Sequence, residues 1–263
     1  MTEHNVISIE QPLYGIAVLL VWGASDPRTT DETALNDWWT NEHLPERLAL
    51  PGFSRARRYF SKTQDGGSKY LALYEAEHLR DLRSEAYLAA LNNPTARTKQ
   101  FMPCLAKLNR SACEVVSSQS NTKSGQYSRS LVGNCIALVT FSRSTIGVSG
   151  EVDLGTRRLI QAAIDAVFAR PGTLNVHVLR EDEETTRIGS TSKSYDSVQF
   201  HAHDEETASE QRIAMIEFSL PLGRAAAELN DTLDTFRSEI EERGATGFTA
   251  ETFDLVCSLD PHP

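Results

Sequence analysis

Short apolar runs alternate with turn signals along the chain and define its predicted elements. Residues 14–22 (YGIAVLLVW) form a run of the length and composition expected of a strand buried on both faces. Further strands are predicted at 53–62, 69–76, 111–117, 134–141, 174–180, 212–220 and 248–259. Helices are predicted at about 31–44, 79–91, 153–169 and 223–242. Pro45 disfavours helical geometry at the preceding residue, so we expect the first helix to end or kink at Leu44.

The order strand, helix, strand, strand, helix, strand therefore occurs twice, which is the ferredoxin-like pattern. Pro51-Gly52 and Pro171-Gly172 mark the same turn in the two copies. Each copy has both helices on one face of its sheet, so the other face must be covered by something else. The predicted fold class is α+β, with two tandem ferredoxin-like modules packed sheet to sheet within one chain.

The predicted domains are residues 1–118 and 131–263, connected by a linker at 119–130. The linker prediction rests on a polar, serine-rich composition with almost no apolar residues. In the second module an acidic segment rich in serine and threonine, residues 181–208, separates the second and third strands. We expect this segment to be a surface excursion, with a lid as one option.

Charge and composition narrow the choice of partners. The formal net charge is -10 and the pI is about 5.2, which argues against nucleic acid, because phosphate binding needs clustered basic residues. The N-terminal residues lack the pattern of a signal peptide, and the apolar run at 16–22 is far shorter than the roughly 20 residues that cross a bilayer. The four cysteines have no CxxC spacing and fit a reducing compartment. We therefore expect a cytoplasmic protein without a membrane partner.

One segment carries a family resemblance. Residues 36–60 (NDWWTNEHLPERLALPGFSRARRYF) combine a helix, His-Leu-Pro near its end, Pro-Gly-Phe and an arginine-rich strand. This arrangement resembles the EthD-like branch of the dimeric α/β-barrel superfamily, and the strand order extends the resemblance over residues 14–117. The resemblance implies an intrachain dimeric α/β-barrel. Ala163 stands where His43 would recur in the second module, so we expect one site, in the first module.

His43 is the leading candidate for chemistry. An imidazole can act as general acid or base near neutral pH, and His43 resembles the histidine of the family's His-Leu-Pro motif. The alternative is a structural histidine that binds the end of the helix. We group His43 with Arg57 and Tyr59 as catalytic candidates, because an arginine or a phenol can stabilise an oxyanion. The substrate-binding candidates are Trp38, Trp39, Arg55 and Tyr74, with core packing or ion pairing as the alternative for each.

Other polar residues receive structural interpretations. We expect Glu42 and Arg47 to form surface ion pairs, and Glu75 and Glu217 to mark polar strand ends.

Four further histidines are candidates for capping, core packing or metal binding. We expect His78 to cap the second helix and His177 to be a satisfied core histidine. His201 and His203 could bind a metal from one face of an extended segment, but no further ligand is in sight. No phosphate-binding loop appears either, so we expect no metal and no cofactor.

The family resemblance implies a cofactor-independent lyase or cyclase that acts on a polyketide-like or aromatic small molecule of secondary metabolism. Cyclisation, dehydration and decarboxylation are the reactions considered, with His43 moving the proton. Two alternatives stay open: a non-catalytic binding or accessory protein, and a cofactor-free monooxygenase. Whether the fused barrel pairs further into a homodimer also stays open.

Overall fold

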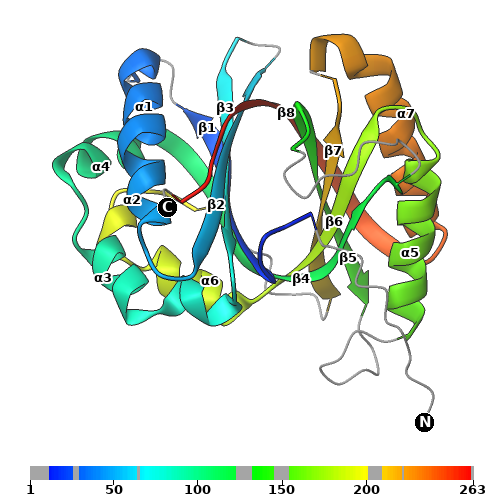
Figure 1. The fold of residues 1–263 in the computed structure, drawn as a ribbon, viewed down its shortest axis with the longest axis horizontal. Helices are drawn as coiled ribbons and strands as arrows, with labels where there is room; N and C mark the ends of the chain where they lie inside the picture. Colours follow the sequence, from blue (N-terminus) through cyan, green and yellow to red (C-terminus); the bar gives the residue numbers. More distant parts are fainter. Residues whose placement is uncertain are drawn as a thin grey trace.

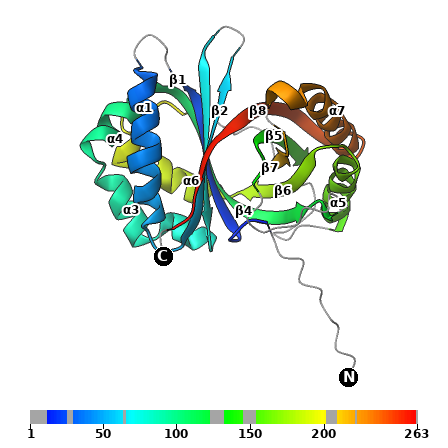
Figure 2. The same ribbon diagram turned by 45° about the horizontal axis from the view of Figure 1, so that its top comes forward.

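The computed structural model describes residues 12–25, 30–63, 66–122, 132–144, 154–200, 209–220 and 222–261. Within these residues, eight antiparallel strands form one closed barrel with helices on its outside (Figures 1 and 2). The strands are β1 (Ala17–Ser25), β2 (Phe53–Lys62), β3 (Ser68–Ala76), β4 (Leu105–Ser120), β5 (Cys135–Ser144), β6 (Thr173–Glu181), β7 (Ser209–Phe218) and β8 (Ala245–Leu259). The α-helices are α1 (Glu32–Trp38), α2 (Leu44–Leu48), α3 (Glu85–Asn92), α4 (Ala96–Phe101), α5 (Leu154–Phe168), α6 (Glu183–Ser190) and α7 (Leu222–Glu241).

The strand order divides the barrel into two halves. Around the barrel the strands follow the order β1-β3-β2-β8-β5-β7-β6-β4. The first four strands of the sequence are therefore neighbours, and so are the last four, and each set shows the same arrangement. Two seams join the halves, β2 with β8 and β4 with β6. Because every strand has a partner on both sides, the barrel has no open edge. The prediction of a closed sheet-to-sheet barrel is confirmed at this level.

Alternating side chains of β1 explain why its sequence is apolar throughout. Leu19 and Val21 pack toward the helices of the first half, whereas Val18, Leu20 and Trp22 pack inside the barrel. Both faces of the strand are buried, so the usual alternation of polar and apolar residues is not needed.

The predicted boundaries differ from the structure mainly at β4. This strand runs from Leu105 to Ser120 and so includes residues assigned to the linker. Its polar end pairs with β6 through Ser117↔Val178 and Ser120↔Asn175. Pairing in the ladder uses backbone groups, which serine supplies as well as valine does. Residues 123–130 of the predicted linker lie outside the described residues.

Of the two outcomes predicted at Leu44, an end of the helix is wrong, because the chain stays helical through this residue. Leu44 is helical (φ -62°, ψ -50°), and its N–H binds Trp39 O, five residues earlier, at the end of a π-helical turn, Trp39–His43. Pro45 is then the second residue of α2, which begins at Leu44. A π-turn shifts the hydrogen bonds by one residue, so the proline enters where no N–H is required and the chain continues as a helix.

The segment at 181–208 is not a simple surface excursion. Figure 1 shows α6 among the helices of the first half, although its sequence belongs to the second. Ser194 Oγ donates to Leu91 O at 2.7 Å, and Arg110 Nη1 donates to Thr186 O at 2.8 Å. Tyr195 is buried in the core of the first half. The second half therefore supplies part of the first half's structure. Residues 201–208 lie outside the described residues.

Gly189 of α6 gives a test of this docking. A Cβ at Gly189 would lie 2.0 Å from Nη2 of Arg110, whereas a Cβ at Gly223 of α7 would meet nothing within 4 Å. Helical Gly→Ala normally stabilises by about 0.5–1 kcal/mol, but overpacking costs about 1–3 kcal/mol. We expect Gly189→Ala to lower the urea midpoint of unfolding and Gly223→Ala to raise it slightly. A rise for both variants would show that α6 does not press on Arg110.

Candidate functional site

The first helical segment positions His43 inside the fold. Asp31 caps α1 by accepting a hydrogen bond from Ala34 N at 3.0 Å, as the sequence indicates. The π-turn then places Trp39 and His43 in the interior, where the His43 ring lies 4.8 Å from the Trp38 ring, centroid to centroid. Trp38 also stacks on Phe101, at 5.6 Å.

His43 faces a narrow cleft between the sheet and the helices of the first half. The cleft is lined by Leu19, Val21, Trp39, His43, Arg47, Tyr74, Tyr87, Leu91, Met102 and Tyr195. The space between these walls, including the open mouth, is about 310 Å³, of which about 10 Å³ is wide enough for the centre of a water molecule. This corresponds to roughly one water molecule, so a larger ligand requires the walls to move. The lining is mostly aromatic and aliphatic, with a few polar groups, as in many small-molecule sites.

The electrostatic environment keeps the His43 imidazole neutral. Burial lowers the pKa of His43 well below its usual value, and the positive charges of Arg47 and Arg58 lower this pKa further. The Nδ1 atom of His43 has no hydrogen-bond partner within the described residues. Glu46 Oε2 lies 3.9 Å from this nitrogen, and the same oxygen lies 3.7 Å from Arg47 Nη2. The ring is thus an available base beside a carboxylate that can stabilise its protonated form.

This lowered pKa predicts an acid-sensitive fold. The unfolded chain binds a proton at His43 near pH 6.5, whereas the folded chain resists it, so stability falls as the pH drops below about 6.5 toward the folded-state pKa. We expect His43→Gln to lose less stability than wild type over this interval. Urea unfolding at several pH values measures the difference, and parallel pH curves for the two proteins would contradict it.

The tyrosines of the cleft are hydrogen-bond donors at neutral pH. Burial raises the pKa of Tyr74 and of Tyr195, with the nearby guanidiniums of Arg47 and Arg110 opposing part of the shift at Tyr195. Both phenols therefore keep their protons and can donate them to an oxyanion.

The structure divides the residues predicted to act together. His43, Trp39 and Tyr74 line one cleft, and Trp38 lies directly behind His43. Arg55, Arg57 and Tyr59, in contrast, lie inside the barrel.

The grouping of His43 with Arg57 and Tyr59 is therefore wrong. Successive residues of a strand face opposite sides of the sheet. Tyr74 of β3 faces the cleft, whereas the next residue, Glu75, binds Arg57 inside the barrel at 3.0 Å. Burial raises the pKa of Tyr59, whose hydroxyl accepts from Arg57 Nη1 at 3.1 Å. The sheet itself separates these groups from His43.

A buried ionic network lies inside the barrel. Arg55 Nε donates to Glu75 Oε1 at 2.7 Å, and Arg57 Nη1 donates to Glu217 Oε1 at 2.5 Å. Glu217 also accepts from Asn175 Nδ2 at 3.0 Å. Glu75 and Glu217 are each next to last in their strands, as predicted, but they are 0% and 1% exposed and so belong to the interior of the barrel. These two ion pairs are stable in the interior because each charged group has an oppositely charged partner and hydrogen bonds.

His177 belongs to the same network. Its Nε2 lies 3.1 Å from Glu217 Oε1 and its Nδ1 lies 2.9 Å from Ser118 Oγ. Both ring nitrogens are engaged, so the prediction of a satisfied core histidine is confirmed.

Glu42 and Arg47 do not pair at the surface with each other. Glu42 Oε2 accepts from Arg97 Nη1 at 3.3 Å, and Glu42 Oε1 accepts from Thr95 Oγ1 at 2.7 Å. Arg47 instead points inward and is 2% exposed. The predicted ion pair of Glu42 therefore exists with another partner, and the prediction for Arg47 is wrong.

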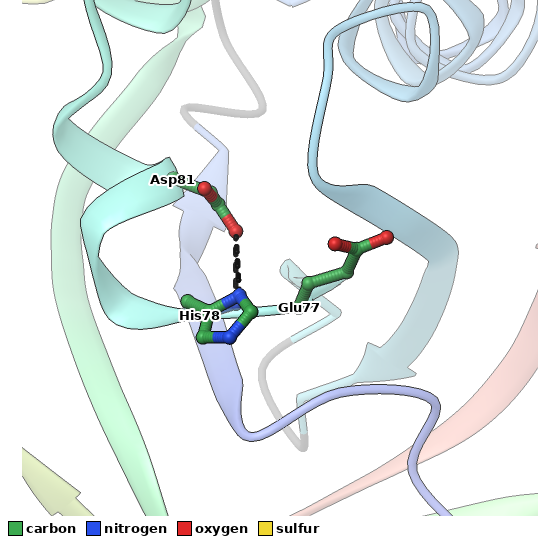
Figure 3. Close-up of side chains that lie close together, drawn as sticks. All are labelled: Glu77, His78 and Asp81. Atoms are coloured by element: carbon green, nitrogen blue, oxygen red, sulfur yellow. Dashed lines mark hydrogen bonds and ion pairs between the residues drawn. The ribbon is translucent and has the colours of Figure 1, made fainter.

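Glu77, His78 and Asp81 form the one cluster of possible metal ligands found within the described residues, with ligand atoms within 4.8 Å of one another (Figure 3). Asp81 Oδ2 already accepts from His78 N at 2.9 Å and lies 3.6 Å from His78 Nδ1. These contacts cap the short helix Leu79–Arg83, which confirms the capping role of His78, and the group is accounted for without a metal. His201 and His203 lie outside the described residues.

Tyr87 and Tyr195 of the cleft, and Glu46 beside His43, had no functional prediction. Glu46 lies three residues after His43 on a continuous helix, a spacing that would have placed the two side chains together if the proline had not been taken as a break. Tyr195 comes from a segment of the second half, and no local sequence pattern predicts that long-range contact.

Comparisons with known proteins identify the fold. No family model matches the chain, and no curated protein matches it. An anthrone oxidase-like protein superposes with a TM-score of 0.57 at 11% identity, covering 95% of each chain. A candidate monooxygenase from Lactobacillus acidophilus NCFM superposes with a TM-score of 0.51 at 6% identity, covering 93% of this chain and 96% of the other. A candidate chlorite dismutase gives 0.51 at 11% identity, covering 91% and 94%.

Within the described residues, no helix is long and apolar enough to cross a membrane. The barrel architecture and the similarity to these three structures agree with each other. This chain has the same fold as these three structures, which in this chain is a closed eight-stranded antiparallel barrel with helices on its outside.

Proposed function

We propose that the chain is a cofactor-independent enzyme of lyase or cyclase type that transfers a proton on an aromatic or polyketide-like small molecule. The observation that carries this proposal is the state of His43. Its imidazole is buried and held neutral, it faces an aromatic cleft, and its Nδ1 is free to bind a substrate. A general base needs these properties together with a route to the substrate.

The cleft supplies the other parts of a proton transfer. His43 removes a proton from an activated carbon or hydroxyl of the substrate, and the imidazolium that forms lies 3.9 Å from the Glu46 carboxylate. The developing negative charge on the substrate oxygen is stabilised by the phenol of Tyr74, which lines the cleft. The aromatic walls, which include Trp39, match a planar apolar frame and keep water out.

A turnover screen tests the proposal. Wild-type protein is incubated with a panel of linear and partly cyclised polyketide analogues and with phenolic acids, and the products are identified by mass spectrometry. We expect loss of water or of carbon dioxide, or isomerisation to a cyclic product of unchanged mass, with no consumption of dissolved oxygen. Binding of these compounds without conversion would favour a binding or accessory protein.

A cofactor-free monooxygenase is the second candidate, because two of the superposed structures are described as anthrone oxidase-like and as a candidate monooxygenase. In this case His43 would form a phenolate or enolate that reacts with molecular oxygen in the same cleft. An oxygen electrode separates the two reactions, since the product of a monooxygenase gains an oxygen atom and dissolved oxygen falls with it.

The EthD-like assignment and the division into tandem ferredoxin-like modules belong to the same proposal. Two observations support the division. The strand orders β4-β1-β3-β2 and β8-β5-β7-β6 are the same order in each half. Glu75 Oε2 accepts from Tyr14 N, and Glu217 Oε2 accepts from Gly133 N, each at 2.8 Å and each just before the first strand of its half. Light scattering at several protein concentrations would show whether the barrel also forms a homodimer.

A further inference from the structure

Arg47 is a buried cation without a hydrogen-bonded counter-ion. It is 2% exposed, and neither of its terminal nitrogens has a hydrogen-bond partner within the described residues. The Glu46 carboxylate approaches Nη2 only to 3.7 Å, which is outside hydrogen-bond distance, and Glu46 is itself partly exposed to solvent. Arg47 lines the cleft, so its unused donors face the space that a ligand would occupy.

Three other buried arginines of the first half, unlike Arg47, donate hydrogen bonds through their guanidinium groups. Arg55 and Arg57 bind carboxylates inside the barrel, and Arg58 donates to Asn36 O at 3.1 Å and to Thr40. A guanidinium removed from water is strongly unfavourable unless its donors are satisfied, and a buried group left unsatisfied requires a reason. The reason that fits a cleft-lining position is that the ligand supplies the anion.

A second cation, Arg110, lies beside Tyr87 and Tyr195, two of the tyrosines that line the cleft. Arg110 is buried, with Nη1 donating to Thr186 O at 2.8 Å and Nη2 donating to the Tyr87 hydroxyl at 3.4 Å. The acceptors in these two hydrogen bonds are a carbonyl oxygen and a phenol oxygen. Neither acceptor is a carboxylate, so neither neutralises the charge of Arg110. The positive charges of Arg47 and Arg110 therefore both act on Tyr195, in a chain whose formal net charge is -10.

We propose that the substrate carries a carboxylate, and that Arg47 binds it with Tyr195 as an additional donor. This inference rests on the proposed function of the same cleft. His43 and Arg47 are four residues apart on a continuous helix, so their side chains begin about 5–6 Å apart. The substrate carboxylate bound by Arg47 would then lie about the width of one aromatic ring from the substrate atom whose proton His43 removes. The substrate class is a planar aromatic or cyclic carboxylic acid.

The test compares matched acid and amide probes. Benzoate and 2-naphthoate are titrated against benzamide and 2-naphthamide, with binding measured by thermal shift and calorimetry on wild type, Arg47→Met and Arg237→Met. Arg237 is an exposed arginine of α7 that pairs with Glu241, so Arg237→Met removes the same charge far from the cleft. A ligand that binds the native state raises the melting temperature by mass action.

We expect wild type and Arg237→Met to bind at least one of the acids about tenfold more tightly than its amide. Arg47→Met should lose this preference while melting at or above the temperature of wild type, because it removes a buried charge whose terminal nitrogens have no hydrogen-bond partner within the described residues. Equal binding of acid and amide by wild type, or no binding of either acid, would overturn the inference. So would an Arg47→Met protein that melts far lower and still prefers the acid.

His43→Gln separates this inference from the proposed function. If the carboxylate is held by Arg47, His43→Gln should keep the preference for the acids over the amides. Binding that depends on Arg47, combined with no conversion of any carboxylic acid, would retain the anion site and reject the enzyme.

Discussion

Replacing His43 with glutamine is expected to lower kcat by about 10²–10⁴-fold, which is the usual contribution of a positioned general acid or base. The effect should be on the chemical step because glutamine cannot take up a proton, while its size and polarity resemble those of histidine. The side chain is nearly buried against Trp38, so a smaller residue would leave a cavity and confuse catalysis with packing.

The pH profile distinguishes a catalytic His43 from a structural one. Because the pKa of His43 lies well below its usual value, the basic form persists at pH 6.5 and below, and kcat should fall only when the pH approaches the lowered pKa. This acidic limb should be missing from the residual activity of His43→Gln.

His78→Gln is the matched control. His78 is a partly exposed histidine that caps a short helix away from the cleft, so this change should leave kcat within about twofold of wild type. If His43→Gln and His78→Gln have the same kcat as wild type, His43 is not the base and the proton transfer must be assigned elsewhere.

Replacing Glu217 with alanine is expected to destabilise the fold by about 3–5 kcal/mol, the cost of breaking a buried ion pair by removing one partner. Glu217 accepts hydrogen bonds from Arg57, Asn175 and Gly133, all of which would lose a partner inside the barrel. Arg57 lies on β2 in the first half and Glu217 on β7 in the second, so the change also removes an interaction across the barrel. Urea unfolding monitored by circular dichroism measures the loss.

Glu251→Ala provides a control with the same connectivity. Glu251 of β8 pairs with Lys69 of β3 at 2.5 Å and so also joins the two halves, but both side chains are about one-third exposed. A pair at the surface contributes about 0–1 kcal/mol. If Glu217→Ala and Glu251→Ala each lowered the free energy of unfolding by less than about 1 kcal/mol, the buried network would not be a major source of stability.

The network also makes an acid-dependent contribution. The adjacent Arg57 and the hydrogen bond from His177 hold the pKa of Glu217 well below its usual value, against the opposing effect of burial. Its contribution is complete above the usual carboxyl pKa of about 4.5 and is lost as the pH falls through the lowered value. Wild type should therefore lose more stability than Glu217→Ala below about pH 4.5.

Several features of the fold could be predicted from sequence because they depend on local patterns. The run at 14–22 and the alternation at 53–62 indicate strands, and Pro51-Gly52 and Pro171-Gly172 mark equivalent turns. The repeated order of elements predicts two sheets with one uncovered face each, and closing them on each other follows from burying those faces. His43 could be singled out because imidazole chemistry and a local motif coincide in one short segment.

The tertiary structure alone decided which polar residues belong together. A strand pattern shows that Arg55, Arg57 and Tyr59 share a face, but it does not show whether that face meets the helices or the interior of the barrel. The Arg57–Glu217 pair spans residues 160 positions apart, so no local pattern can report it.

The same reason applies to the candidate site. Arg47 reads as an exposed helical arginine, since the sequence does not show that the π-turn carries the helix through Pro45 and turns this side chain inward. Tyr195 reaches the cleft because a segment of the second half packs on the first, held by contacts such as Ser194 with Leu91. Sequence determined the elements and their order through local backbone preferences, whereas the composition of the cleft depends on long-range packing that only the folded chain establishes.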